Sequence, residues 1–324
     1  MSVLAYLEVA GGALKKASFE AAYYAAKTAE LAGTTAEAVV LGAASADELA
    51  ALGAYGITKV YHVSDARFNT FDSKAFTKAV AEVADKSGAD YIVLSFGPNG
   101  KVLAPRISAR LKAGYVPGAA ELPKVEGGSL SVVKNVFSGK AKALYQVATA
   151  KKVLAVSPNS LSPVKGSGTA AVEAFTTSLG DADFGTVVKS TDVLTGHVPL
   201  TEADIVVSAG RGLKGPENWG MIEELASLLG AATACSRPVA DVDWRPHHEH
   251  VGQTGFMVKP NLYIAIGISG AIQHLAGVNQ SKVIVVINSD PEAPFFKAAD
   301  YGIVGDAFTV VPKLIEEIKK FKAA

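Results

Sequence analysis

Between Val251 and Asp306, short apolar runs alternate with turns made of glycine and polar residues. The runs Leu262–Ile266, Lys282–Ile287 and Tyr301–Val304 are typical of parallel strands buried on both faces. The residues after them suit hydrogen bonding or close approach: Ser269-Gly270, Asn288-Ser289-Asp290 and Gly305-Asp306. In an open α/β sheet, ligands bind beyond the carboxyl ends of the strands. This segment therefore predicts a parallel α/β sheet with a nucleotide site along one edge.

A glycine-rich turn, Gly210–Gly215, follows the predicted strand Asp204–Ala209 and precedes a helix expected near Pro216. Its G-x-G-x-x-G spacing lets the backbone approach a pyrophosphate at a helix N-terminus, although an ordinary tight turn has the same composition. The acidic residue that an NAD ribose requires about twenty residues later is absent, since the next strand ends in Ala234–Arg237. An NAD-linked dehydrogenase is therefore disfavoured, and Arg211 suits a phosphate.

The chain has 324 residues, more than one hydrophobic core usually supports, so two domains are expected. Strand-like and helical stretches alternate near the N-terminus, which predicts a parallel sheet with helical crossovers. The predicted strands are Val3–Val9, Ala38–Leu41, Lys59–Val63 and Tyr91–Ser95, and the helices are Ser18–Ala32 and Ser73–Lys86. After Pro117, three runs without intervening helices are typical of antiparallel strands: Leu130–Phe137, Ala141–Ala148 and Lys152–Val156.

The domain boundary is expected near Asp192–Leu200, because a fresh strand begins at Asp204. This gives a Rossmann-like α/β domain with added antiparallel strands at residues 1–192, and a parallel-sheet α/β domain at residues 193–324. A hinge at the boundary would let the second domain swivel. A final helix, Pro312–Phe321, is expected to begin with the proline in its first turn.

Charge and cysteine content exclude several classes of protein. Lysine plus arginine and aspartate plus glutamate number 31 each, so nothing favours broad binding to nucleic acid or anionic membranes. The opening residues read at once as a strand without a leader, and the longest apolar run, Leu262–Ile268, is too short to span a bilayer. We expect a soluble protein without membrane insertion, cytoplasmic in a bacterium or in the mitochondrial matrix of a eukaryote.

Two features invite other chemistry. Arg245–His250 holds three histidines, but their spacing matches no common zinc site, so we expect an exposed polar loop and no metal. Cys235, the single cysteine, is expected to be a small buried residue and not a redox thiol.

Several ordered motifs closely resemble the FAD domain of the electron-transfer flavoprotein alpha subunit. They are GRGLKG (Gly210–Gly215), Cys235-Ser236-Arg237, VGQTG (Val251–Gly255), LYIAIGISGAIQH (Leu262–His274), Ile287-Asn288, Asp290-Pro291 with Ala293-Pro294, and ADYGIVGD (Ala299–Asp306). The resemblance is strong over about a hundred residues and looser over the N-terminal part. The extra histidines before VGQTG depart from the family pattern.

The resemblance implies an electron carrier that holds FAD in its C-terminal domain and has no substrate turnover of its own. Its N-terminal domain would pack on a beta subunit, in which AMP or a second FAD is expected. Electrons would come from an acyl-CoA dehydrogenase or another dehydrogenase and pass to a quinone oxidoreductase or another acceptor. A member of an electron-bifurcating or nitrogen-fixation system shares the same motifs and stays open. A non-redox adenine-nucleotide module, suggested by the N-terminal domain, is a further alternative.

The resemblance also assigns residues, with no catalytic residue and no metal ligand among them. The expected FAD contacts are Arg211, Ser236, Arg237, Val251, Gly252, Gln253, Thr254, Ser269, Gly270, Ala271, Ile272, Gln273, His274, Asn288, Asp306 and Ala307.

Within this set, Arg237 would lie over the flavin ring and Thr254 at N5. His274 would lie at the C2 carbonyl, where reduced flavin accumulates negative charge. Arg211 and Ser269, the latter also a plausible helix N-cap, would hold the pyrophosphate. Asn288 and Asp306 would hold the adenosine end. Each residue also has a plain alternative: a surface arginine, a turn, a structural histidine or a turn cap.

Overall fold

A computed structural model describes residues 2–126, 129–137, 139–191 and 198–323. The chain divides into two compact units. One comprises Met1–Val136 and Ala141–Asp192, and most of the other is Val193–Ala324. The hinge expected at Asp192–Leu200 falls largely on residues 192–197, which lie outside the described residues. It therefore stays a prediction.

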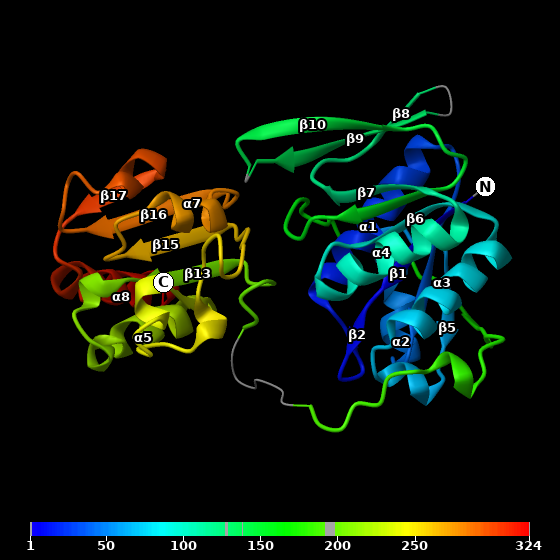
Figure 1. Ribbon diagram of the computed structural model, residues 1–324, viewed down its shortest axis with the longest axis horizontal. Helices are drawn as coiled ribbons and strands as arrows, with labels where there is room; N and C mark the ends of the chain where they lie inside the picture. Colours follow the sequence, from blue (N-terminus) through cyan, green and yellow to red (C-terminus); the bar gives the residue numbers. More distant parts are fainter. Residues whose placement is uncertain (1, 127–128, 138, 192–197, 324) are drawn as a thin grey trace. The chain divides into compact units, whose positions relative to one another are not determined.

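The first unit is built on one sheet with a parallel centre and an antiparallel extension (Figure 1). The order is β10-β9-β7-β11-β6-β1-β4-β5-β12, and β8 pairs with β9. Every pairing from β7 to β12 along this path is parallel, whereas β8, β9 and β10 pair antiparallel. The strands are β1 (Ser2–Leu7), β4 (Ala36–Leu41), β5 (Lys59–Val63), β6 (Ala89–Ser95), β7 (Gly114–Ala119), β8 (Lys124–Glu126), β9 (Ser129–Val136), β10 (Ala141–Val147), β11 (Lys152–Val156) and β12 (Ala171–Ala174), with a small separate pair, β2 (Val9–Ala10) and β3 (Ala13–Leu14).

Helices cover both faces of this sheet. The helices are α1 (Lys16–Leu31), α2 (Ala46–Ala50), α3 (Ser73–Ser87) and α4 (Pro98–Leu111). Buried residues of α1 and α2 join one apolar cluster, and those of α3 and α4 join the cluster on the opposite face. The predicted Rossmann-like layout with added antiparallel strands is confirmed.

One strand assignment in this unit is wrong. Lys152–Val156 was expected to be antiparallel, but β11 lies between β6 and β7 and pairs parallel with both. All five of its residues are buried, as a strand covered on both faces requires. The sequence did not predict this parallel pairing, because β11 directly follows the antiparallel strands β9 and β10 and no helical crossover separates it from them.

The second unit is a five-stranded, entirely parallel sheet in the order β14-β13-β15-β16-β17 (Figure 1). The strands are β13 (Ile205–Ala209), β14 (Ala232–Cys235), β15 (Leu262–Ile266), β16 (Val283–Asn288) and β17 (Tyr301–Val304). The three strands expected after Val251 are present and parallel, but the expectation that all three are buried is wrong for β17. β17 is an edge strand, and all four of its residues are exposed.

Helices lie on both faces of the second sheet as well. They are α5 (Gly220–Leu229), α6 (Arg237–Ala240), α7 (Ile272–Val278) and α8 (Ala307–Ala323). Buried residues of α5, α6 and α8 share one apolar cluster with the sheet, and Val278 of α7 belongs to the cluster on the other face. The helix expected at Pro312–Phe321 begins earlier, at Ala307, and Pro312 lies inside it. A proline within an otherwise periodic stretch resembles a helix start, which explains the error.

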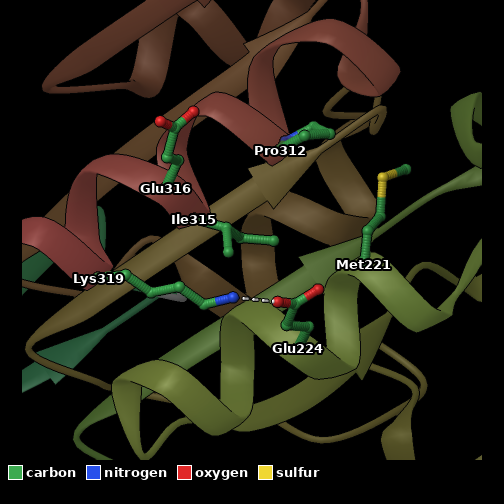
Figure 2. A pocket seen from close by; sticks show the side chains of 6 residues that line it. All are labelled: Met221, Glu224, Pro312, Ile315, Glu316 and Lys319. Carbon is green, nitrogen blue, oxygen red and sulfur yellow. Dashed lines mark hydrogen bonds and ion pairs between the residues drawn. The ribbon is translucent and has the colours of Figure 1, made fainter.

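A surface groove of about 280 Å³ runs between α5 and α8. Figure 2 shows its lining, Met221, Glu224, Pro312, Ile315, Glu316 and Lys319, with an ion pair of 2.7 Å between Lys319 Nζ and Glu224 Oε1. None of the residues assigned to FAD lines this groove. Among the described residues, no helix is long and apolar enough to cross a membrane.

Candidate functional site

The segments that the sequence predicts as a ligand site meet at the carboxyl edge of the second sheet. The strand order reverses at β13, which has β14 on one side and β15 on the other. Such a reversal is where ligands bind in open α/β sheets. Backbone N–H groups just beyond the strands donate to carbonyls of the neighbouring strand: Ser236 to Ala209 (3.1 Å), Gly210 to Ile266 (3.0 Å), Gly267 to Ile287 (2.9 Å) and Gly305 to Asn288 (2.9 Å).

At the reversal, two loops pack backbone against backbone. The Gly212 N–H donates to the Gly267 carbonyl at 3.1 Å. A Cβ at Gly210 would lie 2.4 Å from that carbonyl oxygen, and a Cβ at Gly212 would lie 2.7 Å from the Gly267 Cα. These glycines are therefore required for close approach of the two loops.

The helix expected after this turn begins with 3₁₀ geometry. Two short 3₁₀ turns, Arg211–Leu213 and Pro216–Asn218, follow Gly210, and α5 begins only at Gly220. Lys214, with φ of 66°, makes the bend between them. The G-x-G-x-x-G spacing thus marks loop-to-loop packing. Helical backbone does begin at Pro216 as expected, but its first turn is a 3₁₀ turn that leads through Trp219 into α5.

The Val251–Gly255 turn is fastened to both β14 and α7. The Val251 N–H donates to the Cys235 carbonyl at 3.1 Å, and the Gln253 N–H donates to the Gln273 carbonyl at 2.8 Å. Gly277 fits beneath it, since a Cβ there would lie 2.7 Å from the Gly252 Cα. The side chains of Gln253 and Thr254 are exposed. The turn is therefore rigidly held while its polar side chains stay accessible.

His274 is buried, with 6% of its surface exposed. Its Nε2 lies 2.9 Å from the Tyr263 hydroxyl, and its ring meets that of Phe295 edge-on. Its Nδ1 is buried and makes no hydrogen bond of good geometry within the described residues. A weaker hydrogen bond between the imidazole and the Val251 backbone nevertheless acts to raise the imidazole pKa. Burial, with a smaller contribution from nearby His250, outweighs this and lowers the pKa of His274 to about 4. The imidazole is therefore neutral at pH 7.

Ser269 is not a helix N-cap. Helix α7 begins at Ile272, and its N-cap is Ala271. The intervening Gly270, at φ of 82°, crosses Phe295 so closely that a Cβ would lie 2.4 Å from the Phe295 Cβ. Because this crossing extends the loop, Ser269 ends outside the helix, exposed, with its carbonyl accepting from the Phe295 N–H. Ala271, Ile272 and Gln273 are exposed at the same edge.

Two arginines extend from this edge. Arg211 is exposed in the first 3₁₀ turn. Arg237 begins the four-residue α6, and its Nε lies 3.3 Å from Asp241 Oδ2. Ser236 is the buried N-cap of that helix and makes no side-chain cap bond. Both arginines are thus exposed, and Arg237 is already paired with Asp241; their contacts to a ligand stay a prediction.

Asn288 and Asp306 brace the far end of the edge. The Asn288 Nδ2 donates to the Ile268 carbonyl at 3.0 Å, and its Oδ1 accepts from the Asp290 N–H at 3.0 Å. Asp306 is exposed, and its carbonyl accepts from Thr309 and Val310 at the start of α8. Ala307, the first residue of that helix, is buried. Asn288 therefore has the turn-capping role that was its plain alternative.

The histidine-rich loop is only partly exposed. Glu249 and His250 are buried, while His247 and His248 are exposed. Arg245 forms two hydrogen bonds to Glu249, of 2.8 and 2.7 Å, and Thr233 Oγ1 donates to Glu249 at 3.0 Å. The expectation of an exposed loop is wrong at this end, because an internal ion pair anchors it.

The described residues contain no group of three or more histidine, cysteine or acidic side chains that could hold a metal. Cys235 is buried, and burial raises the pKa of its thiol to about 12. A protonated, buried thiol fits the predicted structural role.

Two residues of the site escaped the sequence analysis. Tyr263 was counted only as a strand residue, and Phe295 was not considered. A tyrosine in an otherwise aliphatic buried run does carry a signal, since its hydroxyl needs a partner when buried. His274 is the natural candidate for that partner, because it lies on α7, the helix that directly follows the strand of Tyr263.

Comparison with known proteins places this chain beside one family over nearly its whole length. The model for the electron transfer flavoprotein domain matches residues 3–179, and that for the electron transfer flavoprotein FAD-binding domain matches residues 199–279. Electron transfer flavoprotein subunit alpha of Bacillus subtilis is 40% identical over 270 residues, which is 82% of each chain. The subunit alpha of Syntrophomonas wolfei is 36% identical over 316 residues, covering 97% of this chain and 98% of that one. The mitochondrial subunit alpha of Dictyostelium discoideum is 39% identical over 280 residues, covering 82% and 78%.

Proposed function

Because the chain belongs to the electron transfer flavoprotein alpha-subunit family, we propose that it carries electrons on an FAD bound at the carboxyl edge of its second sheet. Bound FAD accepts and releases electrons singly or in pairs. The chain's own residues would supply binding, orientation and electrostatic tuning. The strongest support is the meeting of all the family-like motifs at one sheet edge.

The residues at this edge fit a flavin nucleotide in two respects. Gly210, Gly212 and Gly267 keep the strand reversal free of side chains, so a pyrophosphate can approach the backbone there. The buried Nδ1 of His274 lacks a well-formed hydrogen bond within the described residues, as expected of a group reserved for a ligand.

Positive charge would hold the phosphates and tune the ring. Arg211 would pair with the pyrophosphate, with Ser269 beside it. Arg237 would favour reduced, negatively charged states of the ring, because a fixed cation lowers their energy. Thr254 would donate toward the ring edge, and Asn288 with Asp306 would face the adenosine. The remaining contacts would come from Val251–Gln253 and Gly270–His274 and from Ser236 and Ala307.

The proposed partner is a beta subunit, which would bind to the first unit. In this proposal the first unit carries no redox cofactor, and AMP or a second FAD is bound by the beta subunit. An acyl-CoA dehydrogenase or a related enzyme would donate electrons, and a quinone oxidoreductase would accept them. Membership in the electron transfer flavoprotein family supports a carrier, and we propose that it has no reaction of its own. The cytoplasm of a bacterium, or the mitochondrial matrix of a eukaryote, is the proposed location.

The test is to co-express the chain with a neighbouring beta-type subunit and record the visible spectrum of the purified complex. A yellow complex that releases equimolar FAD on denaturation, and whose absorbance bleaches reversibly during anaerobic titration with a reductant, is expected. A colourless complex that does not take up added FAD would refute the proposal.

A further inference from the structure

A buried tyrosine faces His274 across the space between β15 and α7. The Tyr263 hydroxyl and His274 Nε2 lie 2.9 Å apart, and Tyr263 has no exposed surface. The Phe295 ring lies 5.7 Å from the His274 ring and 6.4 Å from the Tyr263 ring, centroid to centroid. The pair is thus buried against an apolar ring, and the polar groups that act on it are the Ser208 side chain, at Tyr263, and the Val251 backbone, at His274.

The direction of this hydrogen bond follows from where the protons must be. Burial raises the pKa of the Tyr263 hydroxyl well above its ordinary value, so the hydroxyl keeps its proton. A hydrogen bond from Ser208 lowers the pKa of Tyr263 and is therefore donated to the phenolic oxygen. The buried hydroxyl proton needs an acceptor of its own, and His274 Nε2, 2.9 Å away, is in place to accept it. If Nε2 accepts, the proton of the neutral imidazole must lie on Nδ1.

The groups around His274 keep its imidazole from taking up a second proton. A protonated imidazole would present a second donor to the tyrosine hydroxyl and leave one proton without an acceptor. The loss of water around the ring opposes a positive charge on His274, and so does His250 to a smaller extent. Only the Val251 backbone acts in the other direction.

We propose that Tyr263 is a positioning residue, which holds His274 as the neutral tautomer protonated at Nδ1 and so makes Nδ1–H the donor that this imidazole offers to the bound ligand. This rests on the proposed function for the identity of the ligand. The tautomer itself is a property of the protein, and it can be measured without reference to electron transfer.

The first experiment is nuclear magnetic resonance on the full chain in complex with its partner, with ¹⁵N-labelled histidine. Long-range ¹H–¹⁵N correlations distinguish the two tautomers, and the His274 signals are those lost in His274→Gln. We expect the Nδ1–H pattern at pH 7 in the unsubstituted protein and a mixture of tautomers in Tyr263→Phe, which keeps the ring and removes only the hydroxyl. The Nε2–H pattern in the unsubstituted protein, or an unchanged pattern in Tyr263→Phe, overturns the proposal. The first of these outcomes does not need Tyr263→Phe, so it decides even if that variant does not fold.

The second experiment is a double-mutant cycle on the midpoint potential of the bound FAD. Tyr263→Phe should lower the potential, by less than His274→Gln does, because a donor near the ring becomes only partly available. In the His274→Gln background, Tyr263→Phe should change nothing further. An equal shift in both backgrounds would show that Tyr263 acts through packing and would overturn the proposal. If the complex holds no FAD, the proposed function fails while the tautomer measurement still decides the role of Tyr263.

Discussion

The close packing of the two loops at the strand reversal makes a substitution at Gly267 informative. Gly267 has φ of 61°, and a Cβ there would lie 2.9 Å from the Gly212 Cα and 3.2 Å from its carbonyl carbon. Gly230, which ends α5, has almost the same φ, 63°, but a Cβ there would meet no atom within 4 Å. The pair Gly267→Ala and Gly230→Ala therefore separates backbone strain from steric clash.

The expected magnitudes follow from these two terms. A left-handed backbone costs an alanine about 1–2 kcal/mol, and this applies to both variants. Crowding against an immobile backbone adds about 1–3 kcal/mol, and this applies only to Gly267→Ala. If FAD binding requires the original loop position, its dissociation constant should rise about 5- to 150-fold in Gly267→Ala. It should stay unchanged in Gly230→Ala.

The assay can isolate the second unit without cutting the chain. Both tryptophans of the chain, Trp219 and Trp244, lie in that unit, so their fluorescence during urea denaturation reports on it alone. FAD affinity is measured separately, by titrating the flavin-depleted complex. The reasoning is refuted if Gly267→Ala is no less stable than Gly230→Ala, or if both bind FAD as tightly as the unsubstituted protein.

Three further predictions concern other groups of the second unit. Arg237→Ala should lower the midpoint potential of FAD by on the order of 40 mV for one electron, because it removes one solvent-screened positive charge. Arg237→Lys keeps the charge and should keep the potential. Potentiometric titration measures both variants, and an unchanged or higher potential in Arg237→Ala would contradict the role of Arg237. The pKa of His274 is about 4 in the folded chain and 6.5 ordinarily, so His274 of the unfolded chain takes up its proton first as the pH falls. The stability that the neutral imidazole gives above pH 6.5 is therefore lost between pH 6.5 and pH 4. Tryptophan-detected urea unfolding should show about 2 kcal/mol of this loss between pH 7 and pH 5, and His274→Gln should reduce it; the same pH dependence in both proteins would exclude the assignment. Arg245→Met should destabilise the second unit by about 3–5 kcal/mol, because it leaves the Glu249 carboxylate buried without its cation. Adding Glu249→Gln should restore part of the lost stability. An unaffected urea midpoint in Arg245→Met would mean that the ion pair does not anchor the loop.

The parallel strands of the second unit could be predicted because their residues are almost uniformly apolar. Leu262–Ile266 was found with both its bounds, since buried parallel strands leave no alternation to confuse the assignment. β11 has the same composition and was identified as a strand, yet its pairing was misjudged. Composition identified the strands, but it did not give their neighbours, which also decide burial: the equally apolar β17 is exposed because it lies at the edge of its sheet.

The carboxyl edge was predicted as a place, but its hydrogen bonds were not. Strand ends and glycines follow from local sequence, so the segments around Gly210, Val251 and Gly267 were located correctly. Ser269 was misassigned because the position of a helix start depended on Phe295, which follows it by 26 residues in sequence and crosses beneath Gly270. The bond between Tyr263 and His274 depends likewise on the crossover that brings α7 over β15. Such contacts are properties of the packed layers and have no pattern within either segment.

The exposed edge strand β17 has a consequence for handling the protein. Tyr301, Ile303 and Val304 are 66%, 42% and 60% exposed, and the strand is bonded on one side only, to β16. A short apolar strand with open backbone groups is a template on which another extended segment can add. As the concentration of purified protein rises, encounters between two such edges become more frequent, so self-association would set the upper limit for storage and crystallisation.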